Sequence, residues 1–291
     1  MKEDVWFQEK VRDQVGQIVR VTEVLLSEKT AFQKIEVLET KQFGRILVLD
    51  GAINVGEKDE FIYHEMLAHV PLFVHPDPRS LLVIGGGDGG TVREALKHPI
   101  ERIDLVEIDE RVIDVSRTYF PSVSCGLDDS RVRIHIGDGT RFVADKENVY
   151  DVVVVDSTDP VGAGTSLYEE AFYRNICRAL TPNGVVTTQS ESPFFDQDIV
   201  QDLYPKLKRV FPLVHMYLAP VPFYPGTCWS FAFCSKGIHP VDGLKRSKKL
   251  TETIKTRYYD RQVHFGAFVL PACIRQLVNG DQQPSGHSEG V

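Results

Sequence analysis

The sequence predicts an α/β protein, in which a mainly parallel sheet covered by helices on both faces follows a smaller region of β-strands. Residues 1–60 are rich in β-branched residues and alternate between apolar and polar positions, which is typical of strands. From about residue 80, apolar strand-like runs alternate with helical segments. This alternation indicates parallel strands joined by helices. A glycine-rich turn at 85–90 joins the first of these strands to a helix.

The N-terminal region is expected to hold three strands and then a helix. The strands are predicted at residues 17–26, 31–39 and 45–51, separated by polar turns. The segment DEFIYHEMLAHVPLF, residues 59–73, places apolar side chains at helical spacing. Asp59 is the expected N-cap of this helix, and Pro71 lies near its end.

The alternating region predicts seven strands and five helices. The strands are expected at residues 80–86, 103–109, 132–138, 151–156, 184–189, 214–221 and 229–235. The helices are expected at residues 91–98, 110–120, 166–180, 195–211 and 271–278. We expect an N-terminal β-strand domain at 1–60, a catalytic domain at 61–275 and a disordered tail at 276–291.

Composition and charge exclude several classes of protein. The chain has 291 residues, of which 42% are apolar, and a net charge of −8 without any run of lysine or arginine. It is therefore a poor candidate for binding nucleic acid. The five cysteines form no CxxC pair, the N-terminus lacks the apolar core of a signal peptide, and no apolar run is long enough for a membrane helix. These features predict a cytoplasmic location and no contact with membranes.

The glycine turn predicts a ligand at the carboxyl edge of the sheet. Glycines allow backbone N–H groups to approach a ligand closely at the start of a helix. Glu107 ends the next strand, twenty residues after Gly87, where an acid can accept hydrogen bonds from ribose hydroxyls. Asp88 lies within the turn, where its charge would repel a pyrophosphate. It therefore indicates a ligand with a cationic group, although it could instead only cap the helix.

Three further acids follow later strands at the same edge. Asp138 follows the third strand, where an acid reads the amino group of adenine; an ordinary turn aspartate before glycine is the alternative. Asp156 and Asp159 follow the fourth strand, VVVVD, ahead of a loop rich in proline and glycine. A helix-capping loop is the alternative for this pair. Together with Asp88 and Glu107, the acids would repel one another unless a cationic ligand lay between them.

Seven segments together resemble the spermidine synthases, the polyamine aminopropyltransferases, over about residues 5–275. They are LVLDGAINVGEKDEFIYHEMLAHVPL, LLVIGGGDGGTVREALKH, VEIDERVIDVSRTYFP, GDGTRFV, YDVVVVDSTDPVGAGTSLYEEAFY, PFYPGTCWSFAFCSK and RYYDRQVHFGAFVLP. The resemblance implies a methyltransferase-like Rossmann fold with a seven-stranded sheet after a small N-terminal β domain. It implies transfer of the aminopropyl group of decarboxylated S-adenosylmethionine to putrescine, giving spermidine and methylthioadenosine. It further implies a homodimer or homotetramer, with no metal and no cofactor besides this co-substrate.

The resemblance also assigns roles to individual residues. Asp156 matches the proton acceptor, and the tyrosines that hold the attacking amine match Tyr63 and Tyr224. Residues that match donor-binding positions are Gln33, His64, Asp88, Glu107, Asp138 and Gly139. Residues that match polyamine-binding positions are His64, Asp156, Ser157, Thr158, Asp159 and Glu191. Asp88 would bind the ammonium of the donor and repel the carboxylate of ordinary S-adenosylmethionine.

The sequence departs from the family pattern near the amine pocket. Ala163 stands where many bacterial members have proline, and the segment QSESPFF at 189–195 differs from several members. The acceptor could therefore be cadaverine, agmatine or a longer polyamine instead of putrescine. An S-adenosylmethionine-dependent methyltransferase and a non-catalytic nucleoside-binding protein are the rival functions. A dinucleotide-dependent dehydrogenase is disfavoured, because Asp88 would meet the pyrophosphate.

Overall fold

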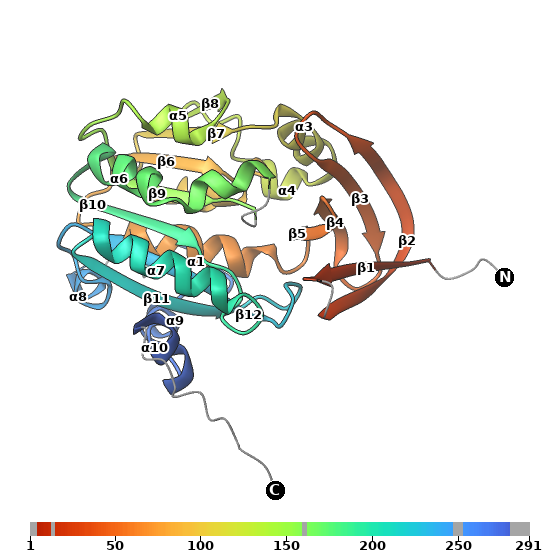
Figure 1. Ribbon diagram of the computed structural model, residues 1–291. Helices are drawn as coiled ribbons and strands as arrows, with labels where there is room; N and C mark the ends of the chain where they lie inside the picture. Colours follow the sequence, from red (N-terminus) through yellow and green to blue (C-terminus); the bar gives the residue numbers. More distant parts are fainter. Residues whose placement is uncertain (1–4, 13–14, 159–161, 247–252, 280–291) are drawn as a thin grey trace, which may run out of the picture.

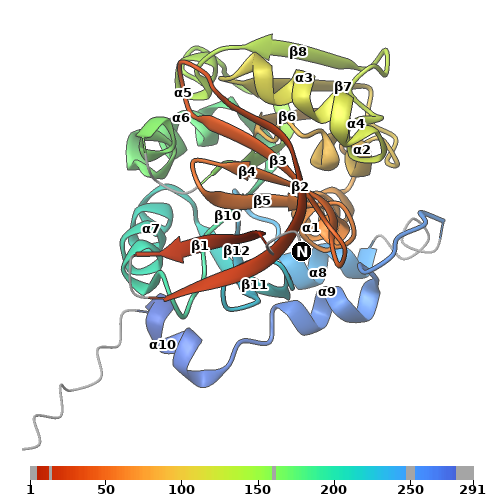
Figure 2. The same cartoon turned by 90° about the vertical axis from the view of Figure 1, so that its right-hand side faces the viewer.

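The structure consists of an antiparallel N-terminal sheet beside a larger mixed sheet with helices on both faces (Figure 1). It is a computed structural model, which describes residues 5–12, 15–158, 162–246 and 253–279. The N-terminal sheet stands at the carboxyl edge of the larger sheet, and its broad face is turned to the viewer in Figure 2. Among the described residues, no helix is long and apolar enough to cross a membrane.

Five strands form the N-terminal sheet, and each pairs antiparallel with the next along the chain. They are β1 Val5–Val11, β2 Val15–Lys29, β3 Lys34–Thr40, β4 Gly44–Leu49 and β5 Ala52–Gly56. Alternation along β3 and β4 divides the apolar side chains between two faces. Ile35, Val37 and Leu47 pack with residues of α3 and α4, whereas Leu38 and Ile46 pack with Phe223 on the other face. The strands β1 and β5 lie outside the three predicted segments.

Seven strands form the larger sheet, in the order β11-β12-β10-β9-β6-β7-β8. Their bounds are β6 Ser80–Gly85, β7 Arg102–Glu107, β8 Val132–Ile136, β9 Tyr150–Asp156, β10 Leu180–Gln189, β11 Leu213–Pro220 and β12 Cys228–Ser235. The strands from β10 to β8 pair in parallel, and β12 pairs antiparallel with both β10 and β11. The predicted mainly parallel, seven-stranded, methyltransferase-like sheet is confirmed.

The helices cover both faces of this sheet (Figure 1). They are α1 Glu60–Val74, α2 Gly90–Ala95, α3 Glu110–Tyr119, α4 Pro121–Ser124, α5 Gly139–Val143, α6 Glu170–Ala179, α7 Gln197–Val210, α8 Pro240–Arg246, α9 Arg261–Ala267 and α10 Ala272–Asn279, with a 3-10 helix at Gly162–Tyr168. Val152 and Val154 of β9 pack with α1 on one face, and Val153 and Val155 pack with α6 and α7 on the other. All four valines are fully buried, so β9 is held rigidly through the core.

Three local predictions are wrong. Asp59 precedes α1 but does not cap it with its side chain, because its carboxylate accepts a hydrogen bond from the N–H of Phe223 at 3.0 Å. The helix expected from residue 166 begins at Glu170, after a 3-10 turn. The tail expected from residue 276 overlaps α10, which continues to Asn279 with Val278 buried. Four helices, α4, α5, α8 and α9, were not predicted, and none of them is longer than seven residues.

Candidate active site

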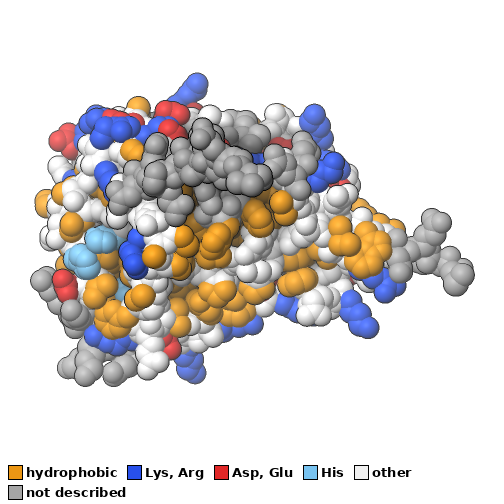
Figure 3. Space-filling view, turned by 60° about the horizontal axis from the view of Figure 1, so that its bottom comes forward, with side chains coloured by type: hydrophobic (Ala, Val, Ile, Leu, Met, Phe, Trp, Pro, Cys, Tyr) orange, Lys and Arg blue, Asp and Glu red, His pale blue; other side chains and the backbone are white. Residues whose placement is uncertain are grey.

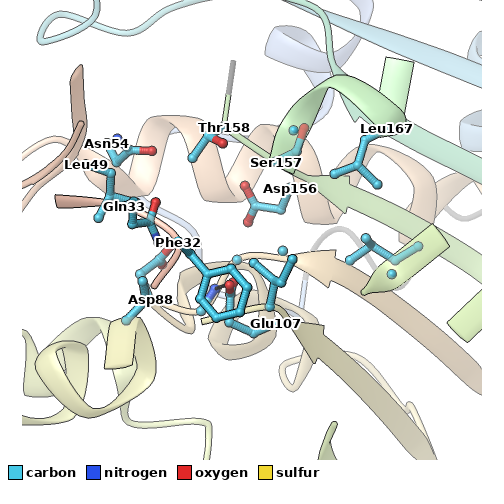
Figure 4. Close-up of a pocket in the computed structure, with 18 of the residues that line it drawn as sticks. Phe32, Gln33, Leu49, Asn54, Asp88, Glu107, Asp156, Ser157, Thr158 and Leu167 are labelled. Carbon is cyan, nitrogen blue, oxygen red and sulfur yellow. Dashed lines mark hydrogen bonds between the residues drawn. The ribbon is translucent and has the colours of Figure 1, made fainter. Parts of the chain in front are cut away.

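Two adjoining cavities open between the carboxyl edge of the larger sheet and the N-terminal sheet. The first, of about 160 Å³, is lined by the glycine turn, the ends of β7 and β9, and the loop before β3. The second, of about 560 Å³, extends toward β1 and the start of α7. Figure 4 shows Gln33, Leu49 and Asn54 of the N-terminal sheet on one side and Thr158 on another, around the carboxylate of Asp156. We call the two spaces the donor cavity and the amine-side cavity, after the substrates that the resemblance to the spermidine synthases leads us to expect there.

The glycine turn lets backbone and carboxylates approach one another closely. Gly86 has φ of +69°, a conformation that side chains disfavour. A Cβ atom on Gly86 would lie 2.7 Å from Oδ2 of Asp156, and one on Gly87 would lie 2.9 Å from Oε2 of Glu107. Both acids therefore line the donor cavity only because the turn carries no side chains at these positions.

Glu107 ends β7 on the floor of the donor cavity. Its Oε2 accepts a hydrogen bond from the N–H of Gly87 at 3.1 Å, and its Oε1 accepts one from the N–H of Asp109 at 3.0 Å. Burial raises the pKa of Glu107 to about 7, against the effect of these two hydrogen bonds. A carboxylate in this position can accept further hydrogen bonds from the hydroxyls of a ribose.

Asp138 and Gly139 line the other wall of the donor cavity. Asp138 is the N-cap of α5, where its Oδ1 accepts hydrogen bonds from the backbone N–H and the hydroxyl of Thr140 at 2.8 and 2.7 Å. Asp138 therefore caps a helix and also lines the cavity, and its contact with an adenine stays a prediction. Gln33 closes the cavity from the N-terminal sheet, and its Nε2 donates to Oδ2 of Asp109 at 3.1 Å.

Asp156 is held at the end of β9 by two hydroxyl donors. Tyr63 Oη donates to Oδ1 of Asp156 at 2.8 Å, and Thr91 Oγ1 donates to Oδ2 at 2.6 Å. Burial and the neighbouring charge of Asp88 raise the pKa of Asp156 above its ordinary value. Asp156 is therefore a fixed carboxylate with increased basicity, and Tyr63, which lines both cavities, lies beside it.

His64 and Asp88 form an ion pair beside Asp156. His64 Nε2 lies 3.1 Å from Oδ1 of Asp88, and its Nδ1 lies 2.6 Å from Oε2 of Glu60. Asp88 Oδ1 also accepts a hydrogen bond from the N–H of Gly90 at 2.7 Å, so it does help to fix the start of α2. Burial opposes ionisation of Asp88, but His64 outweighs it and lowers the pKa of this carboxyl group.

The remaining predicted residues that the structure describes line the amine-side cavity. Tyr224 lies with its ring centroid 5.5 Å from that of Tyr63 and donates its hydroxyl hydrogen to the carbonyl oxygen of Asn54 at 2.8 Å. Glu191 is buried and has φ of +64°, a strained conformation for a residue with a side chain. Its Oε1 accepts hydrogen bonds from Tyr168 Oη at 2.7 Å and Gln189 Nε2 at 2.8 Å.

Ser157 and Thr158 line both cavities. The hydroxyl oxygen of Ser157 is buried and has no hydrogen-bond partner among the residues that the structure describes. A buried hydroxyl without a partner is available to bind a ligand. Asp159 lies outside the described residues. All other predicted site residues line one or both cavities.

One group of side chains among those described has spacing compatible with a metal ion. Ligand atoms of His64, Asp88 and Asp156 lie within 4.8 Å of one another. These atoms already bond to one another or to protein hydroxyl groups, as the contacts above show. That the site works without a metal stays a prediction.

Several contacts at the site were not predicted from sequence. Thr91 orients Asp156, Asp109 holds Gln33, and Glu60 with Arg93 holds His64. Only Glu60 had a recognisable signal, because it precedes His64 by four residues on one face of a predicted helix. The other pairs join segments far apart in the chain, and no sequence pattern connects them.

A Rossmann-like sheet with two adjoining cavities at its carboxyl edge is typical of enzymes that bind a nucleoside next to a second substrate. Two family models match the chain: the spermine/spermidine synthase domain over residues 60–242, and the spermidine synthase tetramerisation domain over residues 5–57. The chain belongs to the spermine/spermidine synthase family. The predicted family and the predicted class of transferase are both confirmed.

Relatives and solved structures agree over nearly the whole chain. A polyamine aminopropyltransferase of Alkaliphilus metalliredigens is 45% identical over 282 residues, which cover 96% of this chain and 99% of the relative. One of Clostridium beijerinckii is 44% identical, covering 95% and 99%. A spermidine synthase in complex with the transition-state analogue AdoDATO superposes with a TM-score of 0.93 at 38% identity, covering 96% of each chain. The spermidine synthase of Thermotoga maritima superposes with a TM-score of 0.90 at 36% identity, covering 96% and 95%.

Proposed function

We propose that the enzyme transfers the aminopropyl group of decarboxylated S-adenosylmethionine to putrescine and releases spermidine and methylthioadenosine. The observation that carries this proposal is the position of Asp156. Its carboxylate lines the donor cavity, and its hydrogen-bond partner Tyr63 lines both cavities. An amine in the second cavity would therefore meet a basic group at the place where it attacks the donor.

The donor cavity offers a partner for each part of the nucleoside. Glu107 would accept hydrogen bonds from the ribose, and Asp138 and Gly139 would contact the adenine. Asp88 would bind the ammonium of the aminopropyl group, and Gln33 would close the cavity over it. The sulfonium activates the carbon under attack, so no cofactor besides this co-substrate is required.

The main chemical difficulty lies in the nucleophile. A primary amine resembles lysine, whose pKa is about 10.4, so near neutral pH only about one molecule in 2,500 is unprotonated. This costs about 4.6 kcal/mol. The raised pKa of Asp156 improves its match to the amine as a general base. We assign Asp156 as the proton acceptor, with Tyr63 and Tyr224 holding the amine beside it.

The amine-side cavity favours a chain with a second cationic group. Glu191 provides a carboxylate away from Asp156, and Ser157 provides a hydroxyl without a described partner. Thr158 and Asp159 belong to the same proposed binding segment. Putrescine is the acceptor we propose; cadaverine, agmatine and longer polyamines are the alternatives, because the cavity of about 560 Å³ admits more than a diamine.

We propose that the protein is a homodimer or homotetramer through its N-terminal sheet. Large hydrophobic side chains of β1 and β2 are exposed, among them Trp6 at 52% and Ile18 at 64%. At the right-hand end of Figure 3, on the side of the N-terminal sheet, hydrophobic side chains lie on the surface. Such a patch is typical of an interface between subunits.

We also propose a cytoplasmic location, with no nucleic-acid or membrane partner. The described cysteines are all free thiols, which fits a reducing compartment.

A product assay tests the proposed function. The enzyme is incubated with either decarboxylated or ordinary S-adenosylmethionine and with a panel of amines, and the products are identified by mass spectrometry. We expect spermidine and methylthioadenosine in equal amounts from the decarboxylated donor and putrescine. Methyl transfer from the ordinary donor, without aminopropyl transfer, would instead support a methyltransferase, and exclusive use of agmatine would replace putrescine as the acceptor.

A further inference from the structure

A chain of buried charges extends from the donor cavity into the protein. Asp88 Oδ1 contacts His64 Nε2 at 3.1 Å, and His64 Nδ1 contacts Glu60 Oε2 at 2.6 Å. Arg93 donates to both oxygens of Glu60 at 2.9 Å each. The side chains of His64 and Glu60 are 3% and 4% exposed, so water screens these contacts little.

The two contacts of His64 determine its charge. Both ring nitrogens face carboxylate oxygens, and only the imidazolium form donates a hydrogen from both nitrogens. Arg93 keeps Glu60 ionised, because its two hydrogen bonds require lone pairs on both oxygens. Burial disfavours the charge, but Asp88 and Glu60 outweigh this effect and hold the pKa of His64 well above its ordinary value.

The imidazolium partly neutralises a strongly acidic environment. Titratable or charged groups face His64 from every element packed around it, namely α1, the glycine turn, α2, β9 and the loop after β11. They are Asp59, Glu60, Tyr63, Asp88, Arg93, Asp156 and Tyr224. The ring cannot move toward α2, because it lies against Gly90 so closely that a Cβ atom there would overlap it. His64 is therefore a fixed cation at the side of Asp88.

We propose that the proton on His64 takes the place of the donor's ammonium in the free enzyme and is released when the donor binds. This inference rests on the proposed function, in which Asp88 binds that ammonium. The arriving donor carries two positive charges, the ammonium and the sulfonium, into a site that already holds an imidazolium. Loss of the Nε2 proton to solvent removes this excess charge.

The neutral ring then has a second use. Glu60 continues to accept the hydrogen of Nδ1, which leaves Nε2 as a lone-pair acceptor directed at the Asp88 side of the cavity. Nε2 can then accept a hydrogen from the donor's ammonium, together with Asp88. Glu60 is in this way a positioning residue, which fixes both the charge of His64 in the free enzyme and its tautomer in the complex.

Calorimetry of two ligands tests the proposal. Binding of decarboxylated S-adenosylmethionine and of methylthioadenosine is measured near neutral pH in phosphate and in Tris, whose ionisation enthalpies differ. Both ligands carry the ribose, so any proton linked to Glu107 cancels in the comparison. We expect binding of the donor to release about one proton more per site than binding of methylthioadenosine. The ratio of the donor's affinity to that of methylthioadenosine should then increase about tenfold for each unit of rising pH.

Three variants identify the group that loses the proton. Glu60→Gln retains an acceptor for Nδ1 but removes the negative charge, so the difference in proton release between the two ligands should fall to nearly zero. Glu60→Asp should partly restore this difference. Asp156→Asn should leave the difference in place. Affinity for methylthioadenosine within about twofold of wild type shows that each variant is folded.

Three results would overturn the proposal. Equal proton release for both ligands in the wild type would mean that His64 keeps its proton, while the proposed function would stand. Loss of the difference in Asp156→Asn but not in Glu60→Gln would assign the proton to Asp156. If the donor did not bind at all, the proposed function itself would fail, and the proton exchange with it.

Discussion

Tyr63 Oη donates a 2.8 Å hydrogen bond to Oδ1 of Asp156, across 93 positions of sequence, and the tyrosine lines both cavities. The bond joins α1, which precedes the larger sheet, to the carboxyl end of β9 at its centre. Thr91 fixes the other oxygen of the same carboxylate. Asp156 therefore has a single orientation, set by residues of two separate helices.

Tyr63→Phe should lower kcat by about 10- to 100-fold, because it removes a hydrogen bond to a charged group. Affinity for methylthioadenosine should change by less than about twofold, since Tyr63 orients the base and the amine. Steady-state kinetics and calorimetry provide the two measurements. Tyr150→Phe is the matched control: it removes a 2.9 Å hydrogen bond from a buried tyrosine to Asp104, away from both cavities. An equal loss of activity in both variants would contradict the role of Tyr63.

Gly86→Ala should reduce turnover by more than about 100-fold. The new Cβ atom would lie 2.7 Å from Oδ2 of Asp156, at a backbone φ of +69°, and would displace the carboxylate from its position. Gly266→Ala in α9 is the control, because nothing lies near a Cβ atom at that position. Turnover of both variants is compared under saturating substrates. A fully active Gly86→Ala enzyme would show that the close approach is not required.

Affinity for methylthioadenosine should depend on pH through Glu107. Burial raises the pKa of Glu107 in the free protein to about 7, and only the ionised carboxylate accepts hydrogen bonds from both ribose hydroxyls. Ligand binding therefore favours loss of the proton, and affinity should increase about tenfold between about pH 6 and about pH 8. Glu107→Gln should bind more weakly and independently of pH. If the affinity of this variant for methylthioadenosine changed with pH as the wild-type affinity does, a group other than Glu107 would cause the pH dependence.

Arg12→Ala should increase the use of longer amines. Arg12 Nε lies 3.1 Å from Asp196, and its Nη1 lies 2.7 Å from Asp198, at the end of the amine-side cavity. Removing the guanidinium frees Asp196, which lines the cavity, to bind a third ammonium. We expect kcat/KM for spermidine relative to putrescine to increase about fivefold, in proportion to one exposed ion pair.

Arg117→Ala is the matched control for this variant. Arg117 pairs with Asp128 at 2.7 Å and is 40% exposed, against 42% for Arg12, but it lines neither cavity. Its ratio of kcat/KM values for spermidine and putrescine should match the wild type. If both variants, or neither, changed that ratio, the preference for putrescine over spermidine would not depend on Arg12.

The sequence predicts the strand ends at the site well, because each acid follows an apolar run whose pattern is local. Glu107 and Asp156 end β7 and β9, Asp138 follows β8, and parallel strands bring their carboxyl ends to one edge. The glycine turn is likewise local, and its Asp88 faces the same cavity.

Contacts between distant segments could not be predicted in this way. Arg93 and Glu60 lie on different helices, and their pairing depends on how α2 packs against α1. The side chain of Asp59 was expected to cap α1, but it instead accepts a hydrogen bond from the backbone N–H of Phe223, which lies far along the chain. Tertiary packing determines these contacts, and a single sequence carries no local signal for them.

The proposal that Asp156 accepts the proton of the attacking amine is tested by the variant Asp156→Asn. Rates of spermidine formation from decarboxylated S-adenosylmethionine and putrescine are measured for the variant and the wild type, with methylthioadenosine affinity as a check of folding. If Asp156 is the proton acceptor, turnover should fall by at least about 100-fold while affinity stays nearly unchanged. Undiminished turnover in Asp156→Asn would show that Asp156 does not have this role.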